Sequence, residues 1–135
     1  MTITVRYAES DDDVIAVHKF LCVVAGPTLP GPIDAKDSVE EVWRCANRDV
    51  ALMAMRDGLL VGTMGIINPP FWWNHTIKFL TNRWLFAIPG SRAWRPLLKE
   101  AKAIAVASDL ELHVLNEYRG TYLILNKSAS RSRPE

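Results

Sequence analysis

The chain has 135 residues, of which 49% are hydrophobic and 23% are charged, and its formal net charge is +1. This length and composition are typical of one globular domain and exclude a disordered chain. The near-neutral charge gives no electrostatic reason to expect nucleic acid as a partner. The sequence shows no signal-peptide pattern and no stretch near the ~18 apolar residues of a membrane span. We therefore expect a cytoplasmic protein that binds neither nucleic acid nor membrane.

Two cysteines, Cys22 and Cys45, lie inside apolar helical patterns and have no metal-ligand spacing. This placement favours free thiols in a reducing compartment over a disulfide. We expect no metal site.

The first part of the chain predicts one strand followed by two helices. Residues Thr2–Tyr7 alternate and are rich in β-branched side chains, which is typical of a strand. Ser10 and Asp13 then form a capping-box pattern at the start of a helical apolar repeat. Ser38 with Glu41 three residues later repeats this start signal and predicts a second, short helix.

The rest of the chain predicts a meander of strands, a helix and a last strand. Two apolar runs flank Asp57-Gly58, a strong signal for a tight hairpin turn. The predicted segments that follow are an irregular aromatic stretch over residues 71–78, a long buried strand over 79–88, a helix on Leu97, Leu98, Ala101, Ile104 and Ala105, and a strand over Asp109–Asn116. The order β-α-α-β-β-β-α-β predicts an α/β (α+β) mixed sheet whose last crossover is right-handed, which makes the final strand pair parallel. We expect a single domain over residues 1–126 and a polar, basic, disordered tail over 127–135.

The segment between the buried strand and the next helix is a candidate anion site. The strand stops at Pro89-Gly90, and Arg92 and Arg95 precede the helical pattern. Backbone N–H groups at a helix start bind anions, and arginine adds charge-assisted hydrogen bonds to phosphate. Pro96 is tolerated in a first helical turn but removes one N–H group. A plain helix start with two solvated arginines remains the alternative.

The order of elements and three motifs together resemble the GCN5-related N-acetyltransferase (GNAT) family over residues 2–116. The motifs are "RDGLLVGTMGII" at 56–67, "NRWLFAIPGSRAWRPLLKEAKAIA" at 82–105 and "LELHVLN" at 110–116. The aromatic block at 65–86 is similar to a phage-associated branch of that family. The chain departs from the family in two places. It lacks the two glycines of the usual Arg/Gln-x-x-Gly-x-Gly/Ala loop, and its C-terminal part looks abridged because no fourth helix is visible.

The resemblance implies a GNAT-like (acyl-CoA N-acyltransferase) fold and an acyl-CoA-dependent N-acyltransferase. Such an enzyme transfers an acyl group from acetyl-CoA, or another acyl-CoA, to an amine by direct attack and without a metal. The alternative is a catalytically inactive GNAT-like protein that acts through protein contacts. Under the first reading the donor needs a strand edge for its pantetheine and a helix start for its pyrophosphate. The residues predicted to bind it are Phe86, Ala87, Ile88, Ser91, Arg92, Ala93, Trp94 and Arg95.

Candidate catalytic residues lie in and after the last predicted strand. Glu111 and His113 alternate onto one face of that strand and could take the proton of the amine; a half-solvated face is the alternative. Tyr118 is the nearest match to a tyrosine that acts as general acid in the resembled family. We interpret His18 as structural and His75 as a loop hydrogen-bonding residue.

Two further features concern partners. Arg83 interrupts an apolar strand and either binds an acidic group of the acceptor or lies at the sheet surface. The aromatic segment Phe71–Trp73 could line an acceptor pocket, fill the core or form a homodimer contact. The acceptor is expected to be a small-molecule or peptide amine, which the sequence does not identify. The near-neutral charge disfavours contact of the aromatic segment and tail with a membrane surface.

Overall fold

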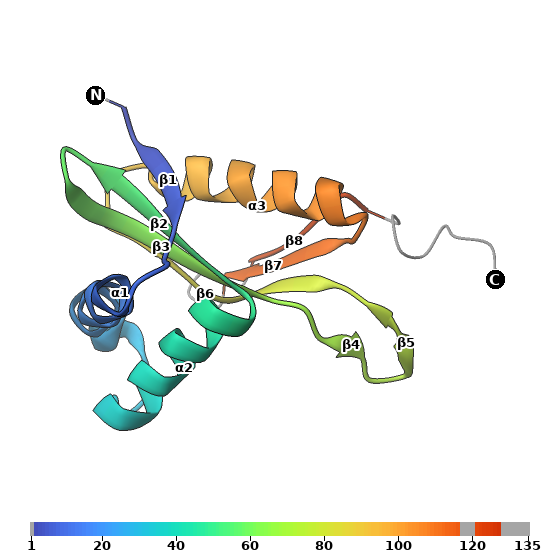
Figure 1. Ribbon diagram of the computed structural model, residues 1–135, viewed down its shortest axis with the longest axis horizontal. Helices are drawn as coiled ribbons and strands as arrows, with labels where there is room; N and C mark the ends of the chain where they lie inside the picture. The colour runs from blue at the N-terminus through green and yellow to red at the C-terminus, as the bar shows by residue number, and fades with distance from the viewer. Residues whose placement is uncertain (1, 117–120, 128–135) are drawn as a thin grey trace.

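A mixed sheet with helices on both faces organises the chain, and the computed structural model describes residues 2–116 and 121–127 (Figure 1). Within these residues six strands pair in the order β1-β2-β3-β6-β7-β8, and β4 and β5 form a separate two-stranded hairpin. The elements are β1 Thr4–Tyr7, α1 Asp11–Val24, the 3₁₀ helix η1 Gly26–Thr28, α2 Ala35–Arg48, β2 Val50–Arg56, β3 Leu59–Ile67, β4 Pro70–Phe71, β5 Asn74–Lys78, β6 Leu80–Ala87, α3 Trp94–Ser108, β7 Leu112–Asn116 and β8 Thr121–Leu125. The predicted mixed fold is confirmed, and β6 and β7 are parallel as expected.

Local signals place the first helix and the first hairpin. The side chain of Ser10 accepts the N–H of Asp13, and the side chain of Asp13 accepts the N–H of Ser10, which completes the predicted capping box of α1. Asp57 and Gly58 have φ angles of 51° and 77°. Positive φ at both central positions is the requirement of the tight turn that joins two twisted strands, so β2 and β3 pair as predicted.

The predicted start of the second helix is wrong by one turn. Asp34, not Ser38, is the N-cap of α2, and its carboxylate accepts the N–H of Asp37 at 2.9 Å. The hydroxyl of Ser38 instead donates to the carbonyl of Asp34 at 2.8 Å. Serine inside a helix commonly bonds back to a carbonyl of the preceding turn, and here this contact removes the hydroxyl from a capping role.

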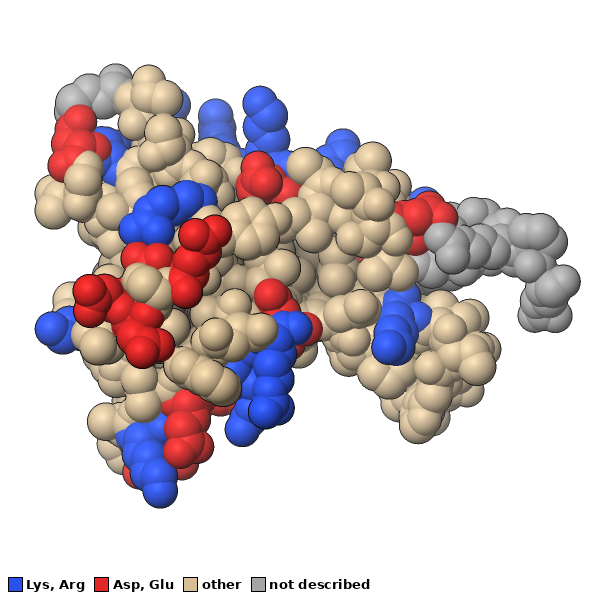
Figure 2. Space-filling view, in the orientation of Figure 1, with Lys and Arg blue, Asp and Glu red and all other residues tan. Residues whose placement is uncertain are grey.

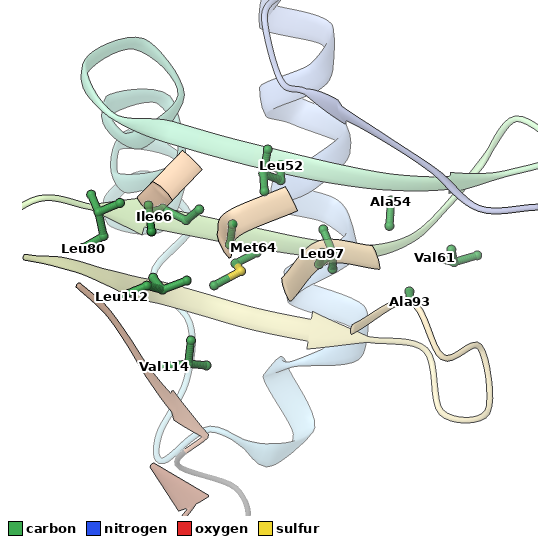
Figure 3. Packing of buried hydrophobic residues seen from close by; sticks show 12 residues of the cluster. Leu52, Ala54, Val61, Met64, Ile66, Leu80, Ala93, Leu97, Leu112 and Val114 are labelled. Atoms are coloured by element: carbon green, nitrogen blue, oxygen red, sulfur yellow. The ribbon is translucent and has the colours of Figure 1, made fainter. Parts of the chain in front are cut away.

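The two faces of the sheet carry different helices. α3 covers one face, over a core that includes Leu52, Met64, Leu97 and Leu112 (Figure 3). α1 and α2 cover the other face, which presents Met53 and Trp84 among other side chains (Figure 1). Trp84 is 8% exposed and belongs to the core on this face.

Two glycines of β3 lie so close to neighbouring side chains that a Cβ atom at either position would displace them. A Cβ atom on Gly65 would lie 2.6 Å from the ring of Trp84. A Cβ atom on Gly62 would lie 2.8 Å from the Cβ of Ala93, which immediately precedes α3. Gly62 therefore sets how closely the beginning of α3 approaches the sheet.

Two strand pairs were not in the predicted order. The aromatic stretch that was expected to be irregular forms the β4–β5 hairpin, which extends from the end of the sheet (Figure 1). β8 follows β7 and pairs with it antiparallel from Leu112–Leu125 to Asn116–Thr121. The expected tail lies outside the described residues from position 128 onward.

The capping box of α1 makes a testable contribution to acid stability. Arg6 donates two hydrogen bonds of 2.9 Å to the carboxylate of Asp13, and this guanidinium holds the pKa of Asp13 well below its usual range. A carboxylate whose pKa is lowered by folding stabilises the fold above its unfolded pKa of about 3.9, and this contribution is lost as the pH falls below that value. We expect Asp13→Asn to lose about 1 kcal/mol at pH 7 in urea denaturation, and the difference from the parent to shrink below about pH 4. Asp12→Asn, which changes another carboxylate of the same turn, is the control; an equal loss there would contradict the role of Asp13.

Candidate functional site

β6 and β7 part after a short region of pairing. Their parallel ladder contains only the pairs Leu80–Leu112 and Thr81–His113 within the described residues. At the next position the side chain of Asn82 replaces backbone pairing. Its amide donates to the carbonyl of Leu115 at 2.9 Å and accepts the N–H of Leu115 at 2.8 Å. Asn82 therefore fixes the point at which the strands separate, and β6 continues with an edge that β7 does not cover.

A bulge reshapes β6 where this open edge begins. Gly65 pairs with Trp84 and Ile66 pairs with Asn82, so Arg83 is the extra residue. A bulge of this kind bends its strand and redirects side chains. Farther along, Ile88 donates to the carbonyl of Val61 at 2.9 Å, on the β3 side. Successive residues of a strand direct their backbone groups to opposite edges, so Leu85 and Ala87 present theirs to the open edge. Of the three predicted edge residues, the backbone groups of Ala87 face the opening, whereas those of Phe86 and Ile88 face β3.

A tight turn connects the open edge to α3. Ser91 donates its N–H to the carbonyl of Ile88 at 3.0 Å, and Gly90 has φ of 81°. This is the arrangement of a turn with Pro89 and Gly90 at its centre. The hydroxyl of Ser91 accepts the N–H of Ala93 at 3.2 Å, and its carbonyl accepts the guanidinium of Arg56 at 2.7 Å. The backbone N–H groups of Ser91 and Ala93 are thus occupied inside the chain.

The start of α3 and the residue before its N-cap leave two backbone donors for a ligand. No side chain caps this helix. Within the part of the chain that the structure describes, the N–H groups of Arg92 and Trp94 make no hydrogen bond, whereas that of Arg95 reaches the carbonyl of Arg92 at 3.2 Å. Arg92 has φ of 59°, a left-handed conformation that favours glycine. Arg92, Trp94 and Arg95 are all exposed, and the guanidinium of Arg95 lies 5.3 Å from the centre of the Trp94 ring. The segment 92–95, which we call the α3 corner, therefore offers two N–H groups and two cations at one helix start.

Glu111 and His113 lie on one face of the sheet, as the alternation predicts, but this face is buried. Glu111 is fully buried and His113 is 5% exposed. Nε2 of His113 lies 2.7 Å from Oε1 of Glu111, and Nδ1 of His113 is hydrogen-bonded to the hydroxyl of Tyr122. Tyr122 is 58% exposed and pairs with Leu115, the residue that Asn82 holds. A hydrogen-bonded chain thus runs from a buried carboxylate to a phenol at the point where β6 and β7 part.

The β4–β5 hairpin covers this chain of polar groups. Phe71 is 5% exposed and stacks on Phe79, and both rings contact the imidazole of His113. Trp72 and Trp73 are 84% and 61% exposed. In Figure 2 the lobe formed by the hairpin is mostly uncharged, while both signs of charge are interspersed over α1 and α2. Phe71 therefore packs within the chain, and only the two tryptophans of the predicted contact face outward.

The remaining predicted residues lie elsewhere. His75 is exposed in β5, and no site forms around it among the described residues. Tyr118 lies outside the described residues. The phenol that contacts His113 belongs to Tyr122, which the sequence does not single out because its position depends on the β7–β8 pairing.

A pocket of about 250 Å³ lies between α1, α2 and β6, beside the bulge. Its walls are largely apolar and include Trp84 and Phe86 of β6. His18 also lines it, and Nε2 of His18 lies 2.6 Å from Oγ of Ser38. Arg83 lines the mouth, 3.4 Å from Glu41.

The arrangement of strands and helices matches solved structures at low sequence identity. No protein-family model matches the chain, and no curated protein matches it by sequence. A GNAT family acetyltransferase of Staphylococcus aureus superposes with a TM-score of 0.63 at 17% identity, over 87% of each chain. A ribosomal-protein-alanine N-acetyltransferase of Brucella melitensis biovar Abortus superposes with a TM-score of 0.68 at 15% identity, over 88% of this chain and 86% of that one. The fold is that of the GNAT acetyltransferases.

A third structure with the GNAT fold concerns the donor. A predicted acetyltransferase of Clostridium acetobutylicum, solved with acetyl-CoA, superposes with a TM-score of 0.63 at 16% identity, over 88% of this chain and 84% of that one.

In the present chain the described residues contain no helix long and apolar enough to cross a membrane. They also contain no group of three or more His, Cys, Asp or Glu side chains arranged to hold a metal.

Proposed function

We propose that the protein is an N-acetyltransferase that transfers an acetyl group from acetyl-CoA to an amine. The observation that carries this proposal is the parting of β6 and β7 at Asn82, next to the uncapped start of α3. An extended chain containing amides can pair with an open strand edge, and a pyrophosphate binds at a helix start with free N–H groups. CoA carries both groups in one molecule, so the open edge of β6 and the adjoining α3 corner can bind two parts of the same ligand.

In the proposed complex the pantetheine arm pairs with the open edge at Leu85 and Ala87. The pyrophosphate accepts the N–H groups of Arg92 and Trp94, with the guanidinium groups of Arg92 and Arg95 around it. The thioester then lies near the bulge, where the amine attacks its carbonyl carbon directly. The C–N bond forms, the C–S bond breaks, and the amine loses a proton.

The chain from Tyr122 through His113 to Glu111 is our candidate for moving protons at this site. Its outer end lies where the strands part. With Nε2–H of His113 donating to the carboxylate of Glu111, Nδ1 accepts the Tyr122 proton. The phenol can therefore pass its proton to the imidazole while its oxygen takes the proton that the amine loses, and CoA leaves as the thiolate.

Calorimetry with CoA and acetyl-CoA tests the donor site. We expect saturable binding, weakened about tenfold or more by Arg95→Glu or Arg92→Ala, because hydrogen bonds to charged groups contribute about 1.5–3 kcal/mol. Lys102→Glu makes the same change of charge at an exposed position farther along α3 and is the matched control. No binding at millimolar CoA, or equal loss in the control, would contradict the proposal.

Thiol release with a panel of amines tests the reaction itself. Burial raises the pKa of the Cys45 thiol to about 12, so this cysteine should contribute little background to a thiol reagent. CoA binding without acetyl transfer to any amine would indicate a binding protein instead of an enzyme.

A further inference from the structure

We infer that the pocket between α1, α2 and β6 takes a free α-amino acid with an apolar side chain as the acetyl acceptor, with its carboxylate on Arg83. This inference rests on the function proposed above and adds the class of acceptor. It starts from the size, lining and charge of the pocket.

The size of the pocket points to a small molecule. Its volume of about 250 Å³ is below the ~300–1,000 Å³ of sites for drug-sized ligands. Leu21, Leu29, Ile33 and Val42 form its walls together with Trp84 and Phe86. An apolar side chain of a few carbon atoms fits this lining, whereas a charged side chain would lose its hydration there.

The charge at the mouth favours an acceptor with an anionic group. The carboxylate of Glu41 lies 3.4 Å from Arg83 and 3.3 Å from Arg44. One carboxylate thus faces two guanidinium groups, which leaves one positive charge in excess. Arg83 is half exposed and has five N–H donors, most of which remain for a ligand. A planar guanidinium is well suited to hold a carboxylate.

The position of Arg83 favours an α-amino acid over other carboxylic acids that carry an amine. Arg83 is the bulge residue at which the open edge of β6 begins, so a carboxylate held there lies next to the proposed thioester. In an α-amino acid the amine and the carboxylate share one carbon atom. The amine is therefore brought to the same place, and the side chain on that carbon can enter the pocket.

Acetylation of three matched compounds tests this inference, with products identified by mass spectrometry. L-leucine has all three features, L-leucinamide lacks the carboxylate, and 3-methylbutylamine lacks the whole carboxyl group. We expect KM for L-leucine to be about tenfold lower than for L-leucinamide, because one charge-assisted interaction is lost. We expect Arg83→Gln to raise KM for L-leucine about tenfold and to leave L-leucinamide unchanged.

Arg48→Gln is the matched control, since Arg48 is exposed in the last turn of α2 and does not line the pocket. This control should keep the preference for L-leucine. Calorimetry of L-leucine with the CoA-loaded protein reports acceptor binding without catalysis. Equal use of leucine and leucinamide, equal effects of the two arginine variants, or no binding of leucine to the CoA-loaded protein would overturn the inference. Failure to bind CoA would instead overturn the proposed function, and calorimetry with CoA alone separates the two cases.

Discussion

Replacing Gly62 with alanine is expected to lower the free energy of unfolding by about 2 kcal/mol and to weaken CoA binding. The new Cβ would lie 2.8 Å from the Cβ of Ala93, 3.1 Å from Leu97 and 3.3 Å from the carbonyl of Phe86. Ala93 and Leu97 are fully buried, so α3 can relieve the contact only by moving its first turn away from β3. Overpacking of this kind costs about 1–3 kcal/mol. Because the proposed donor groups lie in that first turn and directly before it, urea denaturation and CoA calorimetry should change together.

A compensating substitution separates this steric effect from a general effect of changing β3. Ala93→Gly removes the atom at 2.8 Å, and the next contact is the flexible end of Leu97. The double variant Gly62→Ala/Ala93→Gly should therefore recover at least half of the lost stability and part of the CoA affinity. If the losses of stability from the two substitutions are additive, the close approach of α3 to Gly62 is not the cause of the destabilisation.

Features that depend on neighbours in the sequence were predictable. The Ser10–Asp13 capping box, the Asp57-Gly58 turn and the alternation of Glu111 with His113 each involve residues at most three positions apart. The order of elements follows from such signals and, with the motifs, indicates the fold. The start of α2 was predicted one turn too late, because Asp34 caps the helix while the hydroxyl of Ser38 donates back to the carbonyl of Asp34.

Features of the site that depend on long-range pairing were not predictable in the same way. The bulge places Arg83 opposite Glu41 of α2, and the β7–β8 pairing brings Tyr122 to His113. The pocket exists only where α1 and α2 pack against β6, so nothing in the sequence around His18 predicts that this residue lines a cavity. The alternation of Glu111 and His113 also does not tell whether their face is buried or exposed to solvent. Their burial depends on the β4–β5 hairpin, which packs over them.

The buried pair Glu111–His113 should be the most sensitive polar site in the described structure. Glu111→Ala removes the acceptor of Nε2 of His113 and leaves that group buried beneath Phe71 and Phe79. Leaving a buried polar group without its partner costs about 1–3 kcal/mol, and the cavity left by the side chain adds to this cost. We expect the melting temperature to fall by about 5 °C or more for a chain of this size. Glu40→Ala, at an exposed position of α2, should change stability by no more than about 0.5 kcal/mol.

A double-mutant cycle determines whether the loss belongs to the pair. His113→Ala strands the buried carboxylate as Glu111→Ala strands the imidazole, so each single variant carries the penalty of one orphaned group. The double variant removes both groups and should be less destabilised than the sum of the single variants by about 1–3 kcal/mol. Additive losses would mean that the two side chains stabilise the fold independently. Glu111→Gln keeps an acceptor for Nε2 while removing the charge, so it should retain most of the stability. If the chain to Tyr122 moves protons during transfer, that same variant should lower kcat while CoA still binds.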